Sequence, residues 1–374
     1  MPSLFDHNTG SITGADIAHQ RLHNQHLSAT TLKSLKEVVG YLGAVQAQDY
    51  AGAKWAIGQR IPNATDAAID RSFNEGEILR THVMRPTWHF VTPADIRWIL
   101  ELTAPRVHAA NAYMYRKLEL NDAIFKRSNA VLAKALQGGM QLTRTELASA
   151  FKKAGIIADG LRLGYFMMYA ELEGLICSGG RRGKQFTYAL LEERVPQVRA
   201  LKRAEALAEL TRRYFRSRGP ATLQDFVRWS GLTMADARNG IEMVKSQFVN
   251  EMLEGQAYWF SSPGSPASFR EKSPKAYLLP NYDEYFIGFK DRSAIGEVAR
   301  RSNLPENSPS LLAHIIILDG QVVGGWKRTL KKNVVIIELN LITDLTRAEN
   351  RAIADAANRY GKFLGLQVEL AEVD

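Results

Sequence analysis

Two glutamines separated by one alanine form the spacing in this chain that most directly points to chemistry: Gln46-Ala47-Gln48, within YLGAVQAQDYAG. Side chains two positions apart project to the same side of an extended segment but not of a helix. Each primary amide offers one carbonyl acceptor and two N–H donors, so an extended pair can hold a water molecule in a fixed orientation, although neither is a strong base. The spacing by itself favours the alternative, in which the glutamines cap the preceding apolar helix or bond neighbouring backbone.

A histidine lies between two aromatic residues in RPTWHFV. Side chains alternate along a strand, so His89 faces the opposite way to Trp88 and Phe90. We expect the aromatic pair to pack inward and His89 to face a groove or solvent; a hydrogen-bonded structural histidine is the alternative. Arg80 and Arg85 lie on the same predicted hairpin, where a basic wing suits phosphate contact.

The remaining polar motifs are weaker. Asp283-Glu284, in PNYDEYF, invites a metal or acid–base interpretation, but a single acidic pair favours a structural role. Lys327 and Arg328 follow Trp326 at a predicted strand end, which suits either DNA contact or a plain exposed edge. There is no Gly-Lys-Ser/Thr phosphate loop, HExxH, GxSxG or His/Cys cluster, so we expect no metal and no nucleotide cofactor.

Residues 141–190 have the pattern of a complete winged helix. Thr143 or Thr145 is placed to cap a short helix. A longer helix, ended by Gly179-Gly180, is predicted from apolar residues three and four apart: Leu161, Tyr165, Met168, Leu172 and Leu175. A hairpin follows whose tip is basic, with Arg181, Arg182 and Lys184. This order makes a shape that docks on duplex DNA, although some such units only hold proteins together.

The same pattern occurs downstream: Leu207, Leu210 and Tyr214 mark a helix, Thr222 and Thr233 are placed to start two more, and a hairpin of VNEML and AYWF follows. A looser copy lies upstream, with helices predicted at 32–42 and 65–73 and a hairpin of THVM and TWHFV. A hairpin signal at Asp319-Gly320, two further strands and one amphipathic helix mark the last hundred residues, after a linker-like segment at 261–274. We therefore predict an α+β protein with three tandem winged helix-turn-helix units and a small C-terminal β-rich sheet or barrel. The expected boundaries are 1–125, with an N-terminal extension and the glutamine motif, then 126–197, 198–262 and 263–374.

Composition sets the class of protein. The chain has 374 residues, 45% of them hydrophobic, and a net charge of +9, which suits a polyanionic partner such as duplex DNA. No apolar run approaches the roughly 20 residues of a membrane span, and the N-terminus does not read as a signal peptide. The one cysteine, Cys177, excludes an internal disulfide and is expected to be inert core on a helix face. These features fit the cytoplasm.

Four segments, in order, carry a resemblance to a known family: YLGAVQAQDY, ILRTHVMRPTWHFVTPADI, AYLLPNYDEYFIGFKDR and DGQVVGGWKR. The chain resembles, over about residues 20–370, the winged-helix proteins of the AlkZ/YcaQ type, bacterial DNA glycosylases that act on bulky alkylated bases. The resemblance implies three winged helices in a C shape and a C-terminal β domain. It also implies a catalytic Gln–aliphatic–Gln motif, which Gln46 and Gln48 fit with a small aliphatic residue between them. Asp49 falls one residue past the acidic position of the family's other branch.

The resemblance implies a chemistry that suits two amides. A purine alkylated at N3 or N7 is cationic and leaves readily, so a positioned water and amide oxygens near the developing sugar charge suffice. Gln46 and Gln48 would orient that water, and His89 would make a supporting contact to DNA or water. No motif places a nucleophilic lysine, which favours base release without strand cutting. No obligatory protein partner is implied, because tandem units make a monomer sufficient.

Two other functions remain open at this point. A non-enzymatic DNA-binding regulator would use the same tandem units for recognition alone. A winged-helix scaffold with no DNA role is a third possibility, against which the net charge of +9 and the basic wings argue.

Overall fold

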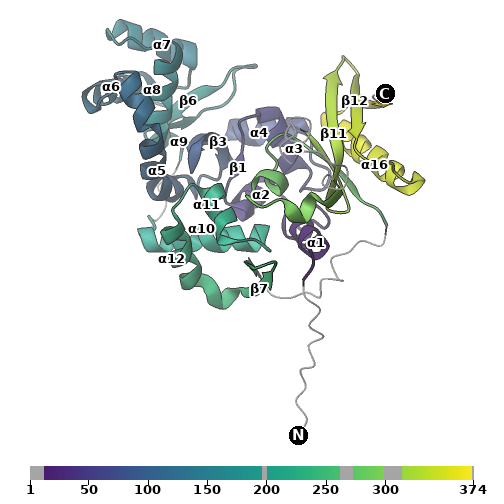
Figure 1. Ribbon diagram of the computed structural model, residues 1–374. Coiled ribbons are helices and arrows are strands. Elements are labelled where there is room, and N and C mark those ends of the chain that lie inside the picture. The colour runs from purple at the N-terminus through teal and green to yellow at the C-terminus, as the bar shows by residue number, and fades with distance from the viewer. Residues whose placement is uncertain (1–11, 196–199, 262–272, 299–313, 373–374) are drawn as a thin grey trace.

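The computed structural model describes residues 12–195, 200–261, 273–298 and 314–372. Within them, after the N-terminal helix α1 (Gly14–Asn24), the same winged-helix order repeats three times and a mixed sheet follows (Figure 1). The predicted fold class, three tandem winged helices and a β-rich C-terminal region, is confirmed.

The first winged helix contains α2 (Leu35–Leu42), β1 (Val45–Gln46), α3 (Tyr50–Gly58), α4 (Asp66–Glu75), β2 (Leu79–Val83) and β3 (Arg85–Val91). Its strands form a sheet in the order β1-β3-β2. Sequence patterns predicted α2, α4 and the hairpin but not α3. The reason is that every α3 residue from Gly52 to Gly58 is buried. A helix that is apolar on all sides has no periodic pattern to detect.

The second winged helix follows the long helix α5 (Ile96–Lys117). It contains α6 (Asp122–Leu136), β4 (Leu142–Thr143), α7 (Arg144–Lys153), α8 (Gly160–Leu172), β5 (Ile176–Ser178) and β6 (Thr187–Leu190), with α9 (Leu191–Arg194) after it. The sheet order is β4-β6-β5, the same topology as in the first unit. Thr143 caps α7 and forms a capping box with Glu146, as one of the two predicted caps.

Two details of the second unit were predicted wrongly. Leu161 is 63% exposed, whereas Phe166 and Met167 are buried, so the core face of α8 differs from the expected stripe. The helix ends at Leu172, well before Gly179, and β5 follows it, so Cys177 lies in a strand. Cys177 is nevertheless inert core, because burial raises the pKa of its thiol to about 12.

The third winged helix matches its sequence prediction element by element. It contains α10 (Arg203–Arg218), α11 (Leu223–Ser230), α12 (Met234–Val244), the 3₁₀ turn η1 (Lys245–Gln247), β7 (Val249–Leu253) and β8 (Gln256–Phe260). Thr222 and Thr233 form capping boxes at the starts of α11 and α12. An isolated bridge between Ala221 and Trp259 occupies the place that β1 and β4 have in the other two units.

The C-terminal region contains β9 (Ala276–Leu279), α13 (Glu284–Ile287), the 3₁₀ turn η3 (Ser293–Ile295), β10 (Ile315–Leu318), β11 (Gln321–Leu330), β12 (Val334–Leu341), α16 (Arg347–Leu364) and β13 (Gln367–Glu372). The sheet order is β13-β12-β11-β10-β9, with β12 and β13 parallel and α16 connecting them. Asp319 and Gly320 both have positive φ, which confirms the predicted two-residue turn. Most of the expected linker, residues 262–272, lies outside the described residues.

Packing joins the first winged helix to the C-terminal region. Trp55 of α3 contacts Tyr360 and Phe363 of α16, each at 5.0 Å between ring centroids, within one shared hydrophobic core. The second winged helix has a core of its own around Phe151 and Phe166. Figure 1 accordingly places the second winged helix and the C-terminal sheet on opposite sides of the first. Among the described helices, none is both long enough and apolar enough to cross a bilayer.

Candidate active site

The two glutamines lie where β1 ends, between α2 and α3. Gln46 pairs with His89 across the sheet, and the Ala47 N–H donates to the Trp88 carbonyl at 2.7 Å, so the motif is extended as expected. Ala47 is buried, Gln46 is 8% exposed and Gln48 is exposed. The Oε1 of Gln48 accepts the Trp88 backbone N–H at 3.3 Å. The segment is therefore fixed against β3, and Gln48 is its solvent-facing member.

Arg85 fixes the side chain of Gln46. Its Nη2 donates to Gln46 Oε1 at 2.8 Å and lies 3.2 Å from His89 Nε2, while Nη1 donates to the Trp229 carbonyl of the third winged helix. Burial lowers the pKa of Arg85 to about 10, with Glu284 acting in the opposite direction, so the guanidinium stays charged at neutral pH. Arg85 thus acts on the glutamine motif, whereas the sequence predicted a phosphate contact on a basic wing.

His89 is fully buried, which contradicts the expectation that it faces a groove or solvent. Its Nδ1 lies 2.9 Å from the Thr87 carbonyl, so Nδ1 carries the proton and Nε2 accepts from Arg85. Burial, and then the neighbouring Arg85, hold the pKa of His89 well below its usual value. The ring is a neutral structural histidine, the alternative that the sequence left open.

Arg80 is also enclosed, at 8% exposure, and is not placed to meet phosphate. Its guanidinium lies 4.2 Å from the Trp88 ring centroid and 4.6 Å from that of Phe186, which belongs to the second winged helix. Its Nε donates to the Ala47 carbonyl at 3.0 Å. Burial lowers the pKa of Arg80 to about 10, with Glu171 opposing. Arg80 and Arg85 therefore hold the motif at its middle carbonyl and at its first amide.

The strongest support for the motif comes from Glu284, at the start of α13, which is fully buried. Its Oε1 accepts the Gln46 backbone N–H at 3.0 Å, and its Oε2 accepts the Trp229 indole N–H at 2.9 Å. Oε2 also forms an ion pair of 2.6 Å with Arg218, a second fully buried residue. Arg218 donates in turn to the Leu42 carbonyl at 2.8 Å. The first and third winged helices and the C-terminal region thus meet at one carboxylate.

Sequence analysis did not find the roles of Glu284, Arg218 and Trp229. The acidic pair was assigned a structural role, and both carboxylates have one: Asp283 forms a buried ion pair with Arg60 at 2.9 Å. The bond between Glu284 and Gln46 had no local signal in the sequence, because 238 positions separate the two residues. No group of three or more potential metal-ligating residues occurs among the described residues. Asp49 caps α3 by accepting the Gly52 N–H at 3.1 Å.

The three basic residues at the hairpin tip of the second winged helix have different surroundings. Arg181 is half-buried and tied to α4, with an ion pair to Asp70 at 3.3 Å and its backbone N–H donated to Asn74 at 2.7 Å. Arg182 is exposed and pairs with Glu146 at 2.8 Å. Lys184 is exposed at the turn. Arg182 and Lys184 therefore remain candidates for DNA contact, while Arg181 joins two units.

Lys327 and Arg328 lie within β11, which is flanked by β10 and β12, so the expected strand end is wrong. Trp326 is buried and donates its indole N–H to the Leu279 carbonyl at 2.9 Å. Lys327 is exposed. Arg328 is half-buried, with its guanidinium 6.0 Å from the Trp326 ring centroid. Burial and then Arg328 lower the pKa of His314, a residue that sequence analysis did not single out, while Asp49 raises it.

Comparisons with known proteins agree with this architecture. The family described as DNA glycosylase AlkZ-like matches residues 39–363. The interstrand DNA cross-link repair glycosylase of Streptomyces sahachiroi is 23% identical over 326 residues, which are 82% of this chain and 85% of that protein. The solved structure of Streptomyces sahachiroi DNA glycosylase AlkZ has a TM-score of 0.78 and 20% identity, and the match covers 97% of this chain and 100% of that one. Because the family match extends over most of its length, this chain belongs to the AlkZ-like family of DNA glycosylases, which are DNA repair hydrolases.

Proposed function

We propose that this protein hydrolyses the N-glycosidic bond of cationic N-alkylated purines in duplex DNA, using a water molecule held by Gln46 and Gln48. The observation that carries the proposal is the pair of amides at the end of β1, bonded to Arg85 and to the Trp88 backbone at 2.8 and 3.3 Å. Fixed amides supply orientation without a strong base, which suits a leaving group that is already cationic.

The two glutamines differ in exposure and bonding, so we assign them different roles. Gln46 is almost fully buried, and one lone pair of its carbonyl is taken by Arg85. Gln48 is exposed, and after its bond to Trp88 its carbonyl keeps a second lone pair. We therefore assign the water contact mainly to Gln48 and a fixing role to Gln46. As the glycosidic bond breaks, the amide oxygen of Gln48 would face the positive charge developing on the sugar.

The substrate class follows from the same argument. Neutral bases such as uracil need protonation or strong assistance to leave. Within the described residues, the one side chain that bonds to the amide of either glutamine is that of Arg85, which is neither a general acid nor a general base at neutral pH. A cross-link formed by alkylation of ring nitrogens on two purines contains the same cationic leaving group. The relative from Streptomyces sahachiroi is named for interstrand cross-link repair, so we include such cross-links in the proposed substrate class.

The site supports base release without strand cutting. A lyase needs a lysine whose amine can be neutral and reach the sugar. Lys54 of α3, the lysine closest to the motif in the sequence, is buried and forms ion pairs of 2.7 and 2.9 Å with Asp66 and Asp70. Those two ion pairs tie its Nζ to α4. We therefore propose a monofunctional glycosylase.

A single-lesion duplex tests the proposal. An end-labelled duplex with one 7-methylguanine is incubated with protein, and half of each sample is heated in alkali, which cuts abasic sites. Strand breaks at the lesion after alkali, and none without it, are expected. Loss of the breaks in Gln48→Ala with unchanged duplex binding supports the assigned role. Tight binding to plain duplex with no base release from any cationic adduct would instead support the DNA-binding regulator.

A further inference from the structure

Two exposed arginines border the glutamine motif without taking part in its side-chain hydrogen bonds. Arg228 lies on α11 of the third winged helix, and Arg106 lies on α5. The chemistry assigned to Gln46 and Gln48 uses neither side chain. A base inside a duplex must be turned out of the stack before its glycosidic bond is hydrolysed, so the backbone beside that nucleotide has to be held. Cations next to the motif are suited to hold it.

Arg228 is fixed to the motif by two connections. Its carbonyl lies 3.5 Å from Nη1 of Arg85, whose Nη2 donates to Gln46 Oε1 at 2.8 Å. The next residue, Trp229, donates its indole N–H to Glu284, the carboxylate that accepts the Gln46 backbone N–H. Because Trp229 and Glu284 are fully buried, α11 cannot shift relative to Gln46 without breaking this bond network. Burial and then Arg228 lower the pKa of Arg85, while Glu284 raises it.

Arg106 adjoins the same arginine through the turn after α11. Its Nε lies 3.5 Å from the Gly231 carbonyl. Gly231 packs closely on the hairpin of the first winged helix, since a Cβ there would lie 3.6 Å from Cγ of Arg85. The two exposed arginines therefore come from separate helices, and both approach the residue that holds Gln46.

Neither exposed arginine has a carboxylate partner among the residues that the structure describes. Exposure does not explain this, because Arg203, whose side chain is 57% exposed, pairs with Asp236 at 2.8 Å. Arg212 likewise pairs with Glu209 at 2.6 Å. Arg85 spends its bonds on the neutral oxygens of Gln46 and Trp229 and on the ring of His89. Positive groups gathered without a counter-ion repel one another, and binding of phosphate relieves that repulsion.

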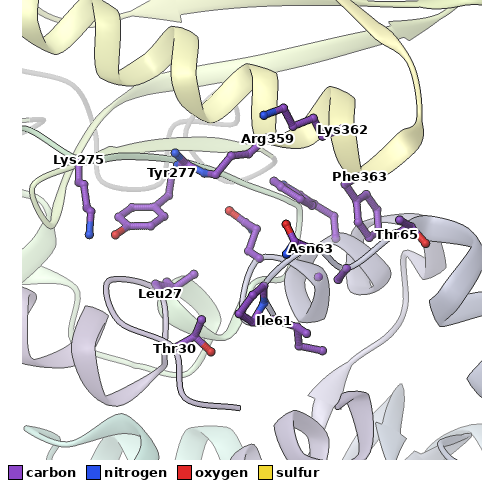
Figure 2. A pocket seen from close by; sticks show the side chains of 15 residues that line it. Leu27, Thr30, Ile61, Asn63, Thr65, Lys275, Tyr277, Arg359, Lys362 and Phe363 are labelled. Carbon is purple, nitrogen blue, oxygen red and sulfur yellow. The ribbon is translucent and has the colours of Figure 1, made fainter. Parts of the chain in front are cut away.

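Cations elsewhere in the fold lack this position. A cavity of about 570 Å³ at the other end of α3 is also lined by basic side chains, of which Arg359 and Lys362 project from α16 (Figure 2). Helix α3 has 9 residues, so this cavity is about 13 Å along the helix from the glutamines. Its cations are therefore too distant to hold the nucleotide whose sugar meets Gln48.

We propose that Arg228 and Arg106 bind the two backbone phosphates that flank the damaged nucleotide and thereby hold its sugar over Gln48. The inference rests on the proposed function, because it takes the glutamines as the site of base release. A guanidinium forms two parallel hydrogen bonds to a phosphate, which fix orientation as well as position. Since every nucleotide carries the same phosphate, the two arginines position the strand whatever its sequence.

Binding to an abasic duplex tests these contacts without requiring base release. The probe is a fluorescent duplex with one tetrahydrofuran abasic-site analogue and a neutral methylphosphonate in place of the phosphate on its 5′ or its 3′ side. We expect each replacement to weaken binding by the parent roughly fivefold in fluorescence anisotropy. In Arg228→Gln one of the two replacements, and in Arg106→Gln the other, should cause no further loss. No loss in the parent, or the same loss in the parent and both variants, overturns the proposal.

Base release separates this inference from the proposed function. With a 7-methylguanine duplex and saturating protein, Arg228→Gln and Arg106→Gln should release the base about tenfold more slowly than the parent. Arg228→Lys should recover part of the rate, because it keeps the charge. Arg116→Gln changes an exposed arginine ten residues further along α5 and should behave like the parent.

The outcomes of the release assay are distinct. A parent that releases 7-methylguanine while both variants keep its rate refutes the inference and leaves the proposed function intact. A parent that releases no base from any cationic adduct refutes the proposed function itself. Urea unfolding should be the same for the parent and the variants, because both side chains are exposed and unpaired. Slower release with unchanged stability therefore assigns the loss to the DNA contact.

Discussion

The first and second winged helices repeat one topology, β1-β3-β2 in one and β4-β6-β5 in the other, but their surroundings differ. In the first, the hairpin turn at Met84 is buried against the third winged helix, where the Met84 carbonyl approaches Gly231 so closely that a Cβ there would lie 2.2 Å away. In the second, the hairpin ends in the exposed residues Arg182 and Lys184. The same fold therefore serves once as an enclosed frame and once as an open surface.

The difference gives a physical reason to place the proposed chemistry in the first, less regular copy. Each unit has a short strand or bridge followed by a helix whose cap is Asp49, Thr143 or Thr222. In the first, Arg85 of the same unit bonds the side chain of Gln46 at that junction, and Glu284 of the C-terminal region bonds its backbone N–H. Enclosure lets the protein fix two amides rigidly, which a surface-exposed junction does not allow.

Removing the buried carboxylate should have the largest effect. Glu284→Ala leaves Arg218 as an uncompensated buried charge and removes the acceptor for Gln46 and Trp229, so the free energy of unfolding should fall by about 3–5 kcal/mol. Urea unfolding followed by circular dichroism measures it. In the second unit, Arg182→Gln breaks an ion pair whose side chains are 54% and 43% exposed and should leave stability nearly unchanged.

If Glu284→Ala does not fold, Glu284→Gln can be compared with Arg182→Gln instead, because glutamine retains an acceptor but loses the charge. Its stability should lie between those of the parent and the alanine variant. If Glu284→Gln and Arg182→Gln are equally mild, the enclosed junction is not held by charge.

Two glutamines, one in each unit, separate catalysis from stability. Gln141 of the second unit accepts the Gly180 N–H at 2.7 Å, so Gln141→Ala should lower the free energy of unfolding by about 1 kcal/mol and leave base release unchanged. Gln48→Ala should slow base release about 100-fold with little effect on stability. Single-turnover release of 7-methylguanine and urea unfolding measure both. A slow Gln141→Ala enzyme would show that the second unit takes part in the chemistry.

Acid should weaken the first unit through His89. The folded pKa lies below the unfolded value near 6.5, so the unfolded chain takes up the proton first. The contribution of His89 is complete above pH 6.5 and is lost as the pH falls below it. Between pH 7 and 5.5, the parent should lose about 1 kcal/mol more stability than His89→Gln.

The difference between the parent and His89→Gln removes the contribution of the other histidines whose pKa is lowered, because both the parent and the variant contain them. The second unit has no histidine between residues 126 and 195, and its contacts with histidines of neighbouring elements are at Glu171 and Glu173. Hydrogen exchange at its amides outside α8 and the turn after it should therefore not share the acid sensitivity of β2 and β3. Identical pH dependence of the parent and His89→Gln would mean that the ring is already protonated in the fold.

The sequence predicted what local rules determine and missed what packing between units determines. The caps at Thr143 and Thr222 and the turn at Asp319-Gly320 follow from side-chain and backbone preferences within a few residues, and the structure has them. Alternation along β3 correctly placed His89 and Trp88 on opposite faces of the sheet, but it could not predict which face the other units cover. Phe186 of the second unit covers Arg80, and Trp229 of the third bonds Arg85, so two expected DNA contacts became supports of the motif.

The smallest effect is expected at the open wing. Lys184→Gln removes one cation from the exposed tip, so if the tip contacts a phosphate, the slope of log affinity against log salt should fall by about 0.9. Affinity for undamaged duplex at low salt should drop a few-fold, equally for unrelated sequences, while single-turnover base release at saturating protein stays the same. Lys327→Gln, on the exposed face of β11, is the matched variant in the C-terminal region. A reduced slope for Lys184→Gln alone places the DNA against the second winged helix. A reduced slope for Lys327→Gln alone places it against the C-terminal sheet. An unchanged slope for both variants would exclude these two residues from the DNA interface.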